Sequence, residues 1–157
     1  MQAPALDISQ WLNTGGEALS LEKLRGRVVV AYAFQMLCPG CVEYCIPQAR
    51  RVHDLFSPSD VAVIGLHTVF EHHDAMGPEA LKAFIHEYKI RFPVGIDRPA
   101  EDGMTFPYTM RAYDMEGTPT LLLIDRAGRL QKQMLGHMPD LALGAEIMRL
   151  VKEGNAS

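Results

Sequence analysis

Cysteine is scarce in this sequence, and the few cysteines present lie close together. The chain of 157 residues has three, at Cys38, Cys41 and Cys45. A framework of structural disulfides needs an even number of cysteines dispersed along the chain. The cluster therefore predicts a chemical site rather than a set of covalent staples.

Positive charge is not in excess either, and no segment looks like a membrane span. The 15 Lys and Arg against 19 Asp and Glu give a formal net charge of −4, which offers no basic surface for nucleic acid. No apolar run is long enough to cross a bilayer, and the N-terminus lacks the charged and apolar regions of a secretory signal. We therefore expect no nucleic-acid or membrane partner, and a cytoplasmic location, or a periplasmic one if a signal has been removed.

No repeat, low-complexity tract or linker divides the chain, so we expect a single domain over residues 1–157. Short β-branched apolar runs predict buried strands, and apolar residues at three- and four-residue spacing predict helices. The predicted strands are 28–34, 61–66, 92–96, 120–125 and 130–135, and the last two form a hairpin. The predicted helices are 39–56, 78–88 and 140–152, with a short helix or turn at 108–113. This alternation implies an α/β sheet covered on both faces.

Cys38 lies where a predicted buried strand gives way to a helix. The free N–H groups and the dipole of a first helical turn favour an anion at that position, which here is a thiolate. Pro39 suits the first helical position, because its missing N–H is not needed there. Cys41, one turn further on, is close enough to attack a mixed disulfide on Cys38. The pair is therefore interpreted as nucleophile and resolving thiol. A zinc site would need a second ligand pair, which the sequence does not supply.

Cys45 is interpreted differently from the other two cysteines. It lies four residues after Cys41 on the same helical face, where Cβ atoms are about 5–6 Å apart. A disulfide needs roughly 3.5–4.5 Å between Cβ atoms. We expect Cys45 to be a small buried core residue, and a second resolving thiol or a soft-metal ligand is the alternative.

A second signal is Gly117-Thr118-Pro119-Thr120, directly before a predicted strand. Proline at the first position of a strand is structurally allowed. A cis bond there would turn the backbone of Thr118 towards a neighbouring loop and present its N–H and C=O to an extended partner. The combination with the Cys38–Cys41 pair is more specific than either feature alone.

Together these segments resemble the thioredoxin-fold superfamily, in its TlpA-like branch and the subgroup similar to the soluble domain of DipZ. The resemblance covers roughly residues 6–150. The matching segments are Trp11–Asn13, Leu19–Val29, Cys38–Cys41, Val63–Thr68, Phe92–Val94 with Asp97, Gly117–Thr120 and Leu123–Gly128.

The resemblance implies a thioredoxin-like fold, with a central mixed β-sheet flanked by helices. It also implies an N-terminal extension and a TlpA- or peroxiredoxin-type insertion at about 67–92. It further implies a cis-Pro119 opposite Cys38, and thiol–disulfide exchange with protein thiols and disulfides. No cofactor is expected beyond the redox-active disulfide. The residues it assigns to substrate binding are Phe34, Pro39, Gly40, Thr118 and Pro119.

The sequence departs from the family pattern around the cysteines. Phe34 stands where members usually have Trp, and Tyr32 stands where thioredoxins have a buried acid. Glu43 lies one place before the Glu of TlpA-like reductases, and Pro47 one place after the usual helix proline. Tyr32 and Glu43 are therefore auxiliary candidates for proton transfer, with Cys45 as a third auxiliary residue.

Three other site chemistries compete with this interpretation. A peroxiredoxin-like thiol peroxidase would need a Pro seven residues and a Thr three residues before its Cys, and neither Cys38 nor Cys41 has them. A Sco-like copper module would use Cys41 and Cys45, with His137 as the proposed third ligand. His67, His72 and His73 suggest zinc, with His67 at a strand end as in the family pattern and the other two on an expected exposed loop. We interpret them as solvated histidines and predict no metal.

Overall fold

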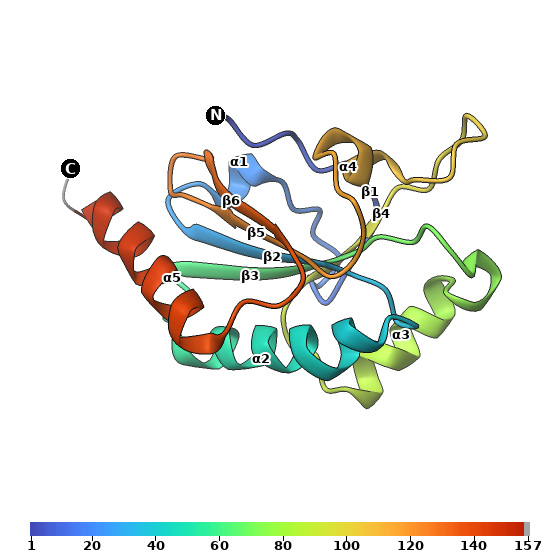
Figure 1. The fold of residues 1–157 in the computed structure, drawn as a ribbon, viewed down its shortest axis with the longest axis horizontal. Helices are drawn as coiled ribbons and strands as arrows, with labels where there is room; N and C mark the ends of the chain where they lie inside the picture. The colour runs from blue at the N-terminus through green and yellow to red at the C-terminus, as the bar shows by residue number, and fades with distance from the viewer. Residues whose placement is uncertain (156–157) are drawn as a thin grey trace.

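A single six-stranded sheet organises the chain, in the strand order β1-β4-β3-β2-β5-β6 (Figure 1). The computed structural model describes residues 1–155, with the side chain of Asn155 left out. Strands β2, β3 and β4 are parallel, and the other pairs are antiparallel. The strands are β1 (Ile8–Leu12), β2 (Val28–Phe34), β3 (Val61–His67), β4 (Val94–Asp97), β5 (Thr120–Ile124) and β6 (Leu130–Leu135). The predicted mixed sheet is thus confirmed.

The central strands are buried on both faces, because helices cover each side of the sheet (Figure 1). The larger helices α2 (Ile46–Leu55), α3 (Pro78–Glu87) and α5 (Asp140–Asn155) pack on one face, and α1 (Leu21–Leu24) and α4 (Tyr108–Ala112) on the other. Successive side chains of β2 alternate between the two cores, as the pleat requires. Within residues 1–155, none of these helices is long and apolar enough to span a bilayer.

The helix after β2 contains a feature that the sequence analysis did not predict. A π-helical turn, η1 (Cys41–Cys45), precedes α2, and the N–H of Ile46 donates to the carbonyl of Cys41, five residues back. Such a turn holds one more residue than an α-helical turn. Pro47 has no N–H for the carbonyl four residues before it. The wider π-turn therefore accommodates Pro47, which stands one position later in the sequence than the usual helix proline of the family. Two of the three thiols, Cys41 and Cys45, are the first and last residues of this turn.

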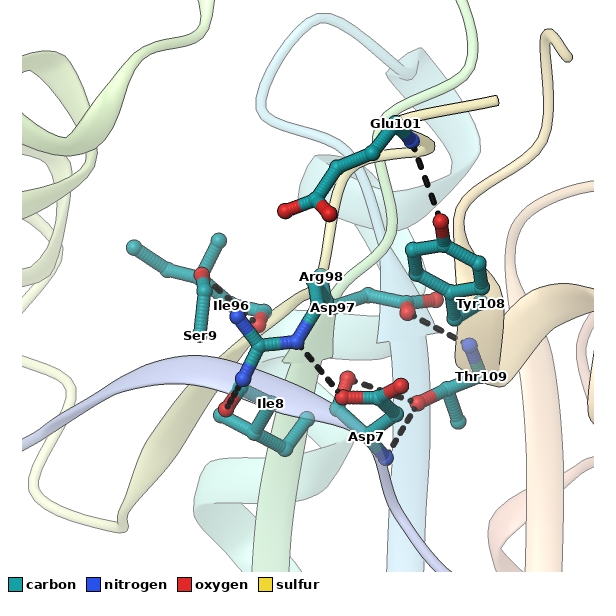
Figure 2. A network of polar contacts seen from close by, with 9 residues as sticks. All are labelled: Asp7, Ile8, Ser9, Ile96, Asp97, Arg98, Glu101, Tyr108 and Thr109. Atoms are coloured by element: carbon teal, nitrogen blue, oxygen red, sulfur yellow. Dashed lines mark hydrogen bonds and ion pairs between the residues drawn. The ribbon is translucent and has the colours of Figure 1, made fainter. Parts of the chain in front are cut away.

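The N-terminal extension forms the edge strand β1, which pairs antiparallel with β4. Figure 2 shows how polar contacts fix this edge. Arg98 Nε donates to Asp7 Oδ1 at 2.7 Å, and the N–H of Asp7 donates to Thr109 Oγ1 at 2.8 Å. The N–H of Thr109 donates to Asp97 Oδ1 at 2.7 Å, so the carboxylate at the end of β4 holds the start of α4. The extension is therefore an integrated part of the sheet.

Candidate active site

The three thiols differ in depth. Cys38 is half-buried at the start of the helix, where its carbonyl accepts the N–H of Val42 at 3.1 Å. Cys41 and Cys45 are fully buried, and all three cysteines are unbridged. Pro39 occupies the first helical position, as the sequence predicts. Cys38 is consequently the thiol of the three that a large partner can reach.

The Thr118–Pro119 segment lies against this cysteine loop, and its peptide bond is cis, as the resemblance implies. Cys38 Sγ donates to the carbonyl of Thr118 at 3.6 Å. A Cβ placed on Gly40 would lie 3.8 Å from Pro119 Cδ. The structure thus brings together the predicted residues Cys38, Gly40, Thr118 and Pro119.

Cys41 is a poor acid in this environment. Burial raises the pKa of the Cys41 thiol well above that of a free thiol, and its contact with the Cys38 thiol raises it further. The backbone of Gln35 and the hydroxyl of Thr118 act in the opposite direction and lower the pKa of Cys41. The contacts from Gln35 and Thr118 therefore make it easier for the buried Cys41 thiol to lose its proton.

Cys45 lies in the hydrophobic core, where the sequence analysis expected it. Burial, and then the nearby Cys38, raise its pKa to about 12. Cys45 therefore keeps its proton at neutral pH and acts as a small apolar group. Its part in any exchange reaction stays a prediction.

The two auxiliary proton carriers lie in different places. Tyr32 is buried, and its hydroxyl donates to Gln48 Oε1 at 2.9 Å. Burial, with the nearby Cys45 and Asp140, raises the pKa of Tyr32 above its usual value. A phenol of that kind does not accept a proton at neutral pH as a base would. Glu43 is exposed, whereas Cys41 on the same turn is buried.

The structure corrects the role assigned to Phe34. Its side chain is fully buried, so it does not form part of the surface that meets a substrate. The ring packs against His67, with ring centroids 5.1 Å apart, and against Phe84 at 6.1 Å. Phe34 therefore supports the site from within the core.

His67 and Met76 were missed as residues that hold the cysteine loop. His67 Nε2 accepts the N–H of Met36 at 3.3 Å, and Met76 Sδ accepts the N–H of Leu37 at 3.4 Å. Burial lowers the pKa of His67 to about 4, so the imidazole is neutral. The interpretation of His67 as solvated is wrong, because it ends a strand covered on both faces. A useful signal was its place directly after the apolar run 61–66.

The other histidines do not assemble a metal centre. His72 and His73 are exposed, as expected from the sequence. The ring of His137, the third ligand of the copper hypothesis, packs on Tyr44 with centroids 5.3 Å apart. Among residues 1–155, no three His, Cys, Asp or Glu side chains are grouped so as to hold a metal ion.

Apolar side chains stand exposed near the reachable thiol. Leu37, directly before Cys38, is 55% exposed, and Tyr44 on the following turn is 53% exposed. Leu135 is exposed too, and its Cδ1 would lie 3.7 Å from a Cβ on Gly117, next to Thr118. Leu37 and Leu135 thus place exposed apolar groups next to the two segments that meet at the thiol, the cysteine loop and Gly117–Thr118.

Comparisons with known proteins show that this chain is similar to thioredoxin-like proteins and thiol–disulfide oxidoreductases. A family model described as Redoxin matches residues 1–146. A solved thioredoxin-like superfamily protein, SPOA0173, is 56% identical, with a TM-score of 0.93 and 96% of each chain covered. A thiol-disulfide isomerase from Corynebacterium glutamicum is 50% identical, with a TM-score of 0.89 and 95% of this chain and 96% of that one covered. These matches confirm the thioredoxin-like architecture.

Curated relatives are more distant in sequence. The thiol-disulfide oxidoreductase ResA of Bacillus anthracis is 26% identical over 122 residues, which are 77% of this chain and 62% of the relative. ResA of Bacillus subtilis (strain 168) is 23% identical over 145 residues, which are 92% of this chain and 73% of the relative. The chain thus spans about 62% of the length of the first curated relatives that it matches.

Proposed function

Because this chain belongs to the Redoxin family, we propose that it is a thiol–disulfide oxidoreductase that exchanges disulfides with protein partners through Cys38 and Cys41. The supporting observation is the arrangement of the two thiols. The reachable Cys38 contacts the Thr118 carbonyl beside cis-Pro119, and Cys41 is buried behind it. The names of the solved and curated relatives point to the same chemistry.

The reaction proceeds in two exchanges. The Cys38 thiolate attacks one sulfur of a partner disulfide, which forms a mixed disulfide and releases the partner's other sulfur as a thiolate. Cys41 then attacks Cys38 Sγ and loses its proton, and the partner's remaining sulfur leaves and is protonated. The partner gains two electrons and two protons, and the chain holds a Cys38–Cys41 disulfide. The reverse sequence oxidises a partner, and the two reduction potentials set the direction.

The chain supplies each group that this reaction needs without a cofactor. Cys38 at the start of the helix supplies the attacking sulfur, and the extended segment before Pro119 offers backbone groups to a partner strand. Gly40 lies beside that segment, with Pro39 before it in the chain, and the exposed Leu37 and Tyr44 give the partner an apolar surface. Protein thiols and disulfides are therefore the proposed substrates.

Variants of the three cysteines test the proposal with a disulfide-bonded protein such as insulin as substrate. Cys38→Ser abolishes reduction, since no reachable nucleophile remains. Cys41→Ser accumulates a mixed disulfide on Cys38, which mass spectrometry locates, and the matched control Cys45→Ala retains activity. A bridge to Cys45 in the oxidised wild type would refute the assignment of Cys41. Consumption of hydrogen peroxide with no turnover of protein disulfides would support the peroxidase alternative instead.

A further inference from the structure

Gln35 joins three segments around the thiols, although it belongs to no motif recognised in the sequence. It follows β2 directly and is 1% exposed. Its side-chain Nε2 donates to Thr118 Oγ1 at 3.2 Å, and its Oε1 accepts the N–H of Phe70 at 3.1 Å. Its backbone carbonyl accepts the N–H of Cys38 at 3.2 Å. One buried residue thus contacts the nucleophile's backbone, the cis-proline segment and the loop after β3.

The direction of these hydrogen bonds is fixed by the chemistry of the groups. A backbone N–H can only donate, so the atom of Gln35 that faces Phe70 must be the amide oxygen. The amide nitrogen therefore faces Thr118 and donates to its hydroxyl oxygen. A hydroxyl that accepts in this way still has its own hydrogen to donate elsewhere.

The Thr118 side chain also forms a hydrogen bond with the Cys41 thiol. The Thr118 hydroxyl lowers the pKa of Cys41, as a donor to the sulfur does. The backbone carbonyl of the same Thr118 meanwhile accepts from Cys38 Sγ. Thr118 therefore presents an acceptor to the first thiol and a donor to the second.

We propose that Gln35 is a positioning residue of the redox site, whose amide holds the Thr118 hydroxyl as a donor to the Cys41 sulfur and so promotes the second exchange. The inference rests on the proposed function. In that step Cys41 attacks Cys38 Sγ, the bond from Cys38 to the partner sulfur breaks, and the proton of Cys41 ends on the departing partner thiol. Gln35 takes no part in the bond changes and acts through Thr118.

Ellman's reagent separates the two steps, because attack by Cys38 releases one coloured thiolate and attack by Cys41 releases the second. The reagent is mixed in equimolar amount with the reduced Cys45→Ala chain, and both phases are followed in a stopped-flow instrument from pH 5 to 9. Gln35→Glu keeps an acceptor for Phe70 but removes the donor to Thr118. We expect the second phase to slow about tenfold at every pH in this range, because the thiolate fraction of a thiol below its pKa falls tenfold for each unit by which that pKa rises. The first phase stays within about twofold.

Matched variants separate positioning from a general structural effect. Thr118→Val slows the second phase as Gln35→Glu does, and the double variant is no slower than either single variant, because both remove one shared interaction. Thr118→Ser keeps the hydroxyl and restores the second phase towards its wild-type rate over the same pH range. Gln133→Glu makes the same change of charge at an exposed position whose amide donates to the Tyr113 carbonyl, and both phases are unchanged.

Two outcomes overturn the inference. Equal slowing of both phases in Gln35→Glu would mean that Gln35 only supports the fold, and an unchanged second phase would mean that it does not act on Cys41. Cys41→Ser distinguishes these results from failure of the proposed function. If that variant releases a single thiolate and keeps the mixed disulfide, the function stands and only the role of Gln35 is lost. If it still releases both, the proposed function itself fails.

Discussion

At the scale of single residues, His67 and Asp97 are two buried ionisable side chains whose pKa values move in opposite directions. Burial lowers the pKa of His67 to about 4 from 6.5. Burial raises the pKa of Asp97 to about 6 from 3.8, against hydrogen bonds from Thr109, Met110 and Thr68. Both side chains line a cavity of about 280 Å³ next to the cysteine loop. In the folded chain the pKa values leave His67 neutral above about pH 4 and Asp97 neutral below about pH 6.

The two shifts have opposite effects on stability between pH 4 and 6. His67 binds a proton more readily in the unfolded chain, so its contribution to the free energy of unfolding grows as pH rises from about 4 to 6.5. Asp97 binds a proton more readily in the folded chain, so its contribution falls as pH rises from 3.8 to about 6. Each contribution amounts to about 3 kcal/mol, and the two nearly cancel.

Replacing His67 leaves the pH-dependent contribution of Asp97 to stability without the opposing contribution of His67. In His67→Gln, whose amide oxygen can still accept the Met36 N–H, we expect the free energy of unfolding to fall relative to wild type by about 3 kcal/mol between pH 4 and 6. Urea denaturation at a series of pH values measures the difference, from which the remaining titrating groups cancel. A difference that does not change with pH would show that His67 is not held neutral.

The residues that carry the chemistry could be predicted from the sequence where a short motif contains them, as with Cys38, Cys41 and the Thr118–Pro119 pair. Gln35 and His67 could not be predicted in the same way. Each directly follows or ends a buried strand, and its hydrogen-bond partner comes from a segment that only the sheet brings near. The family resemblance assigned Phe34 to substrate binding, but the burial of its side chain depends on packing partners such as Phe84 that lie far away in the sequence.

At the scale of elements, a buried glutamine ties α2 to β2 and α5. Gln48 Oε1 accepts from the Tyr32 hydroxyl at 2.9 Å, and Gln48 Nε2 donates to the Met138 carbonyl at 2.6 Å and to Asp140 Oδ1 at 2.9 Å. Arg51, one turn further along α2, forms a two-bond ion pair with the same carboxylate. The start of α5 is thereby fixed against α2, the helix that directly follows the thiols.

Replacing Gln48 should therefore destabilise the fold not only because its hydrogen bonds are lost but also because their buried partners are left unpaired. Gln48→Leu leaves the buried Tyr32 hydroxyl and the Met138 carbonyl without their partner, and we expect a loss of about 2–4 kcal/mol in the free energy of unfolding. The double variant Tyr32→Phe with Gln48→Leu removes the stranded hydroxyl and regains about 1 kcal/mol. Urea titration of four chains, which are wild type, Gln48→Leu, Tyr32→Phe and the double variant, measures these values, and strict additivity would contradict this account.

The long buried elements could be predicted because their apolar pattern is strong, and the two parallel strands β2 and β3 were placed within a residue of their bounds. Strand β1 was missed. Its Ile8–Leu12 segment is half-exposed at the edge of the sheet and carries no continuous apolar run. The π-turn was missed because periodicity over the whole helix hides one additional residue, although the late position of Pro47 was its sign.

At the scale of the whole molecule, the sheet has two edges that are protected differently. Strand β6 alternates half-buried and exposed residues and carries Lys132 along the free edge, and a charged side chain there disfavours pairing with another chain. Strand β4 is covered by β1, whose Trp11 packs within about 3 Å of the Cβ position on Gly95. The N-terminal segment thus covers β4, which would otherwise be the edge strand.

Removing residues 1–13 should consequently promote self-association as well as lower stability. The loss of Ile8 and Trp11 from the sheet should lower the free energy of unfolding by about 3–5 kcal/mol, and the free β4 edge should pair between chains. Size-exclusion chromatography at several concentrations and urea denaturation test this. Trp11→Ala in the full chain loses the packing but keeps the backbone pairing, so its elution should match wild type. A truncated chain that also elutes unchanged would contradict the role of β1.

The order in which a ribosome makes this chain has a consequence for the site. Thr118 is added 80 residues after Cys38, and β5, which pairs with β2, is among the last strands to emerge. Until then the nascent polypeptide has no cis-proline segment to cover the cysteine loop and no finished sheet to bury Cys41 and Cys45. Domains generally fold as units once their sequence is complete. The three thiols are therefore most open to wrong pairing during the chain's own biosynthesis.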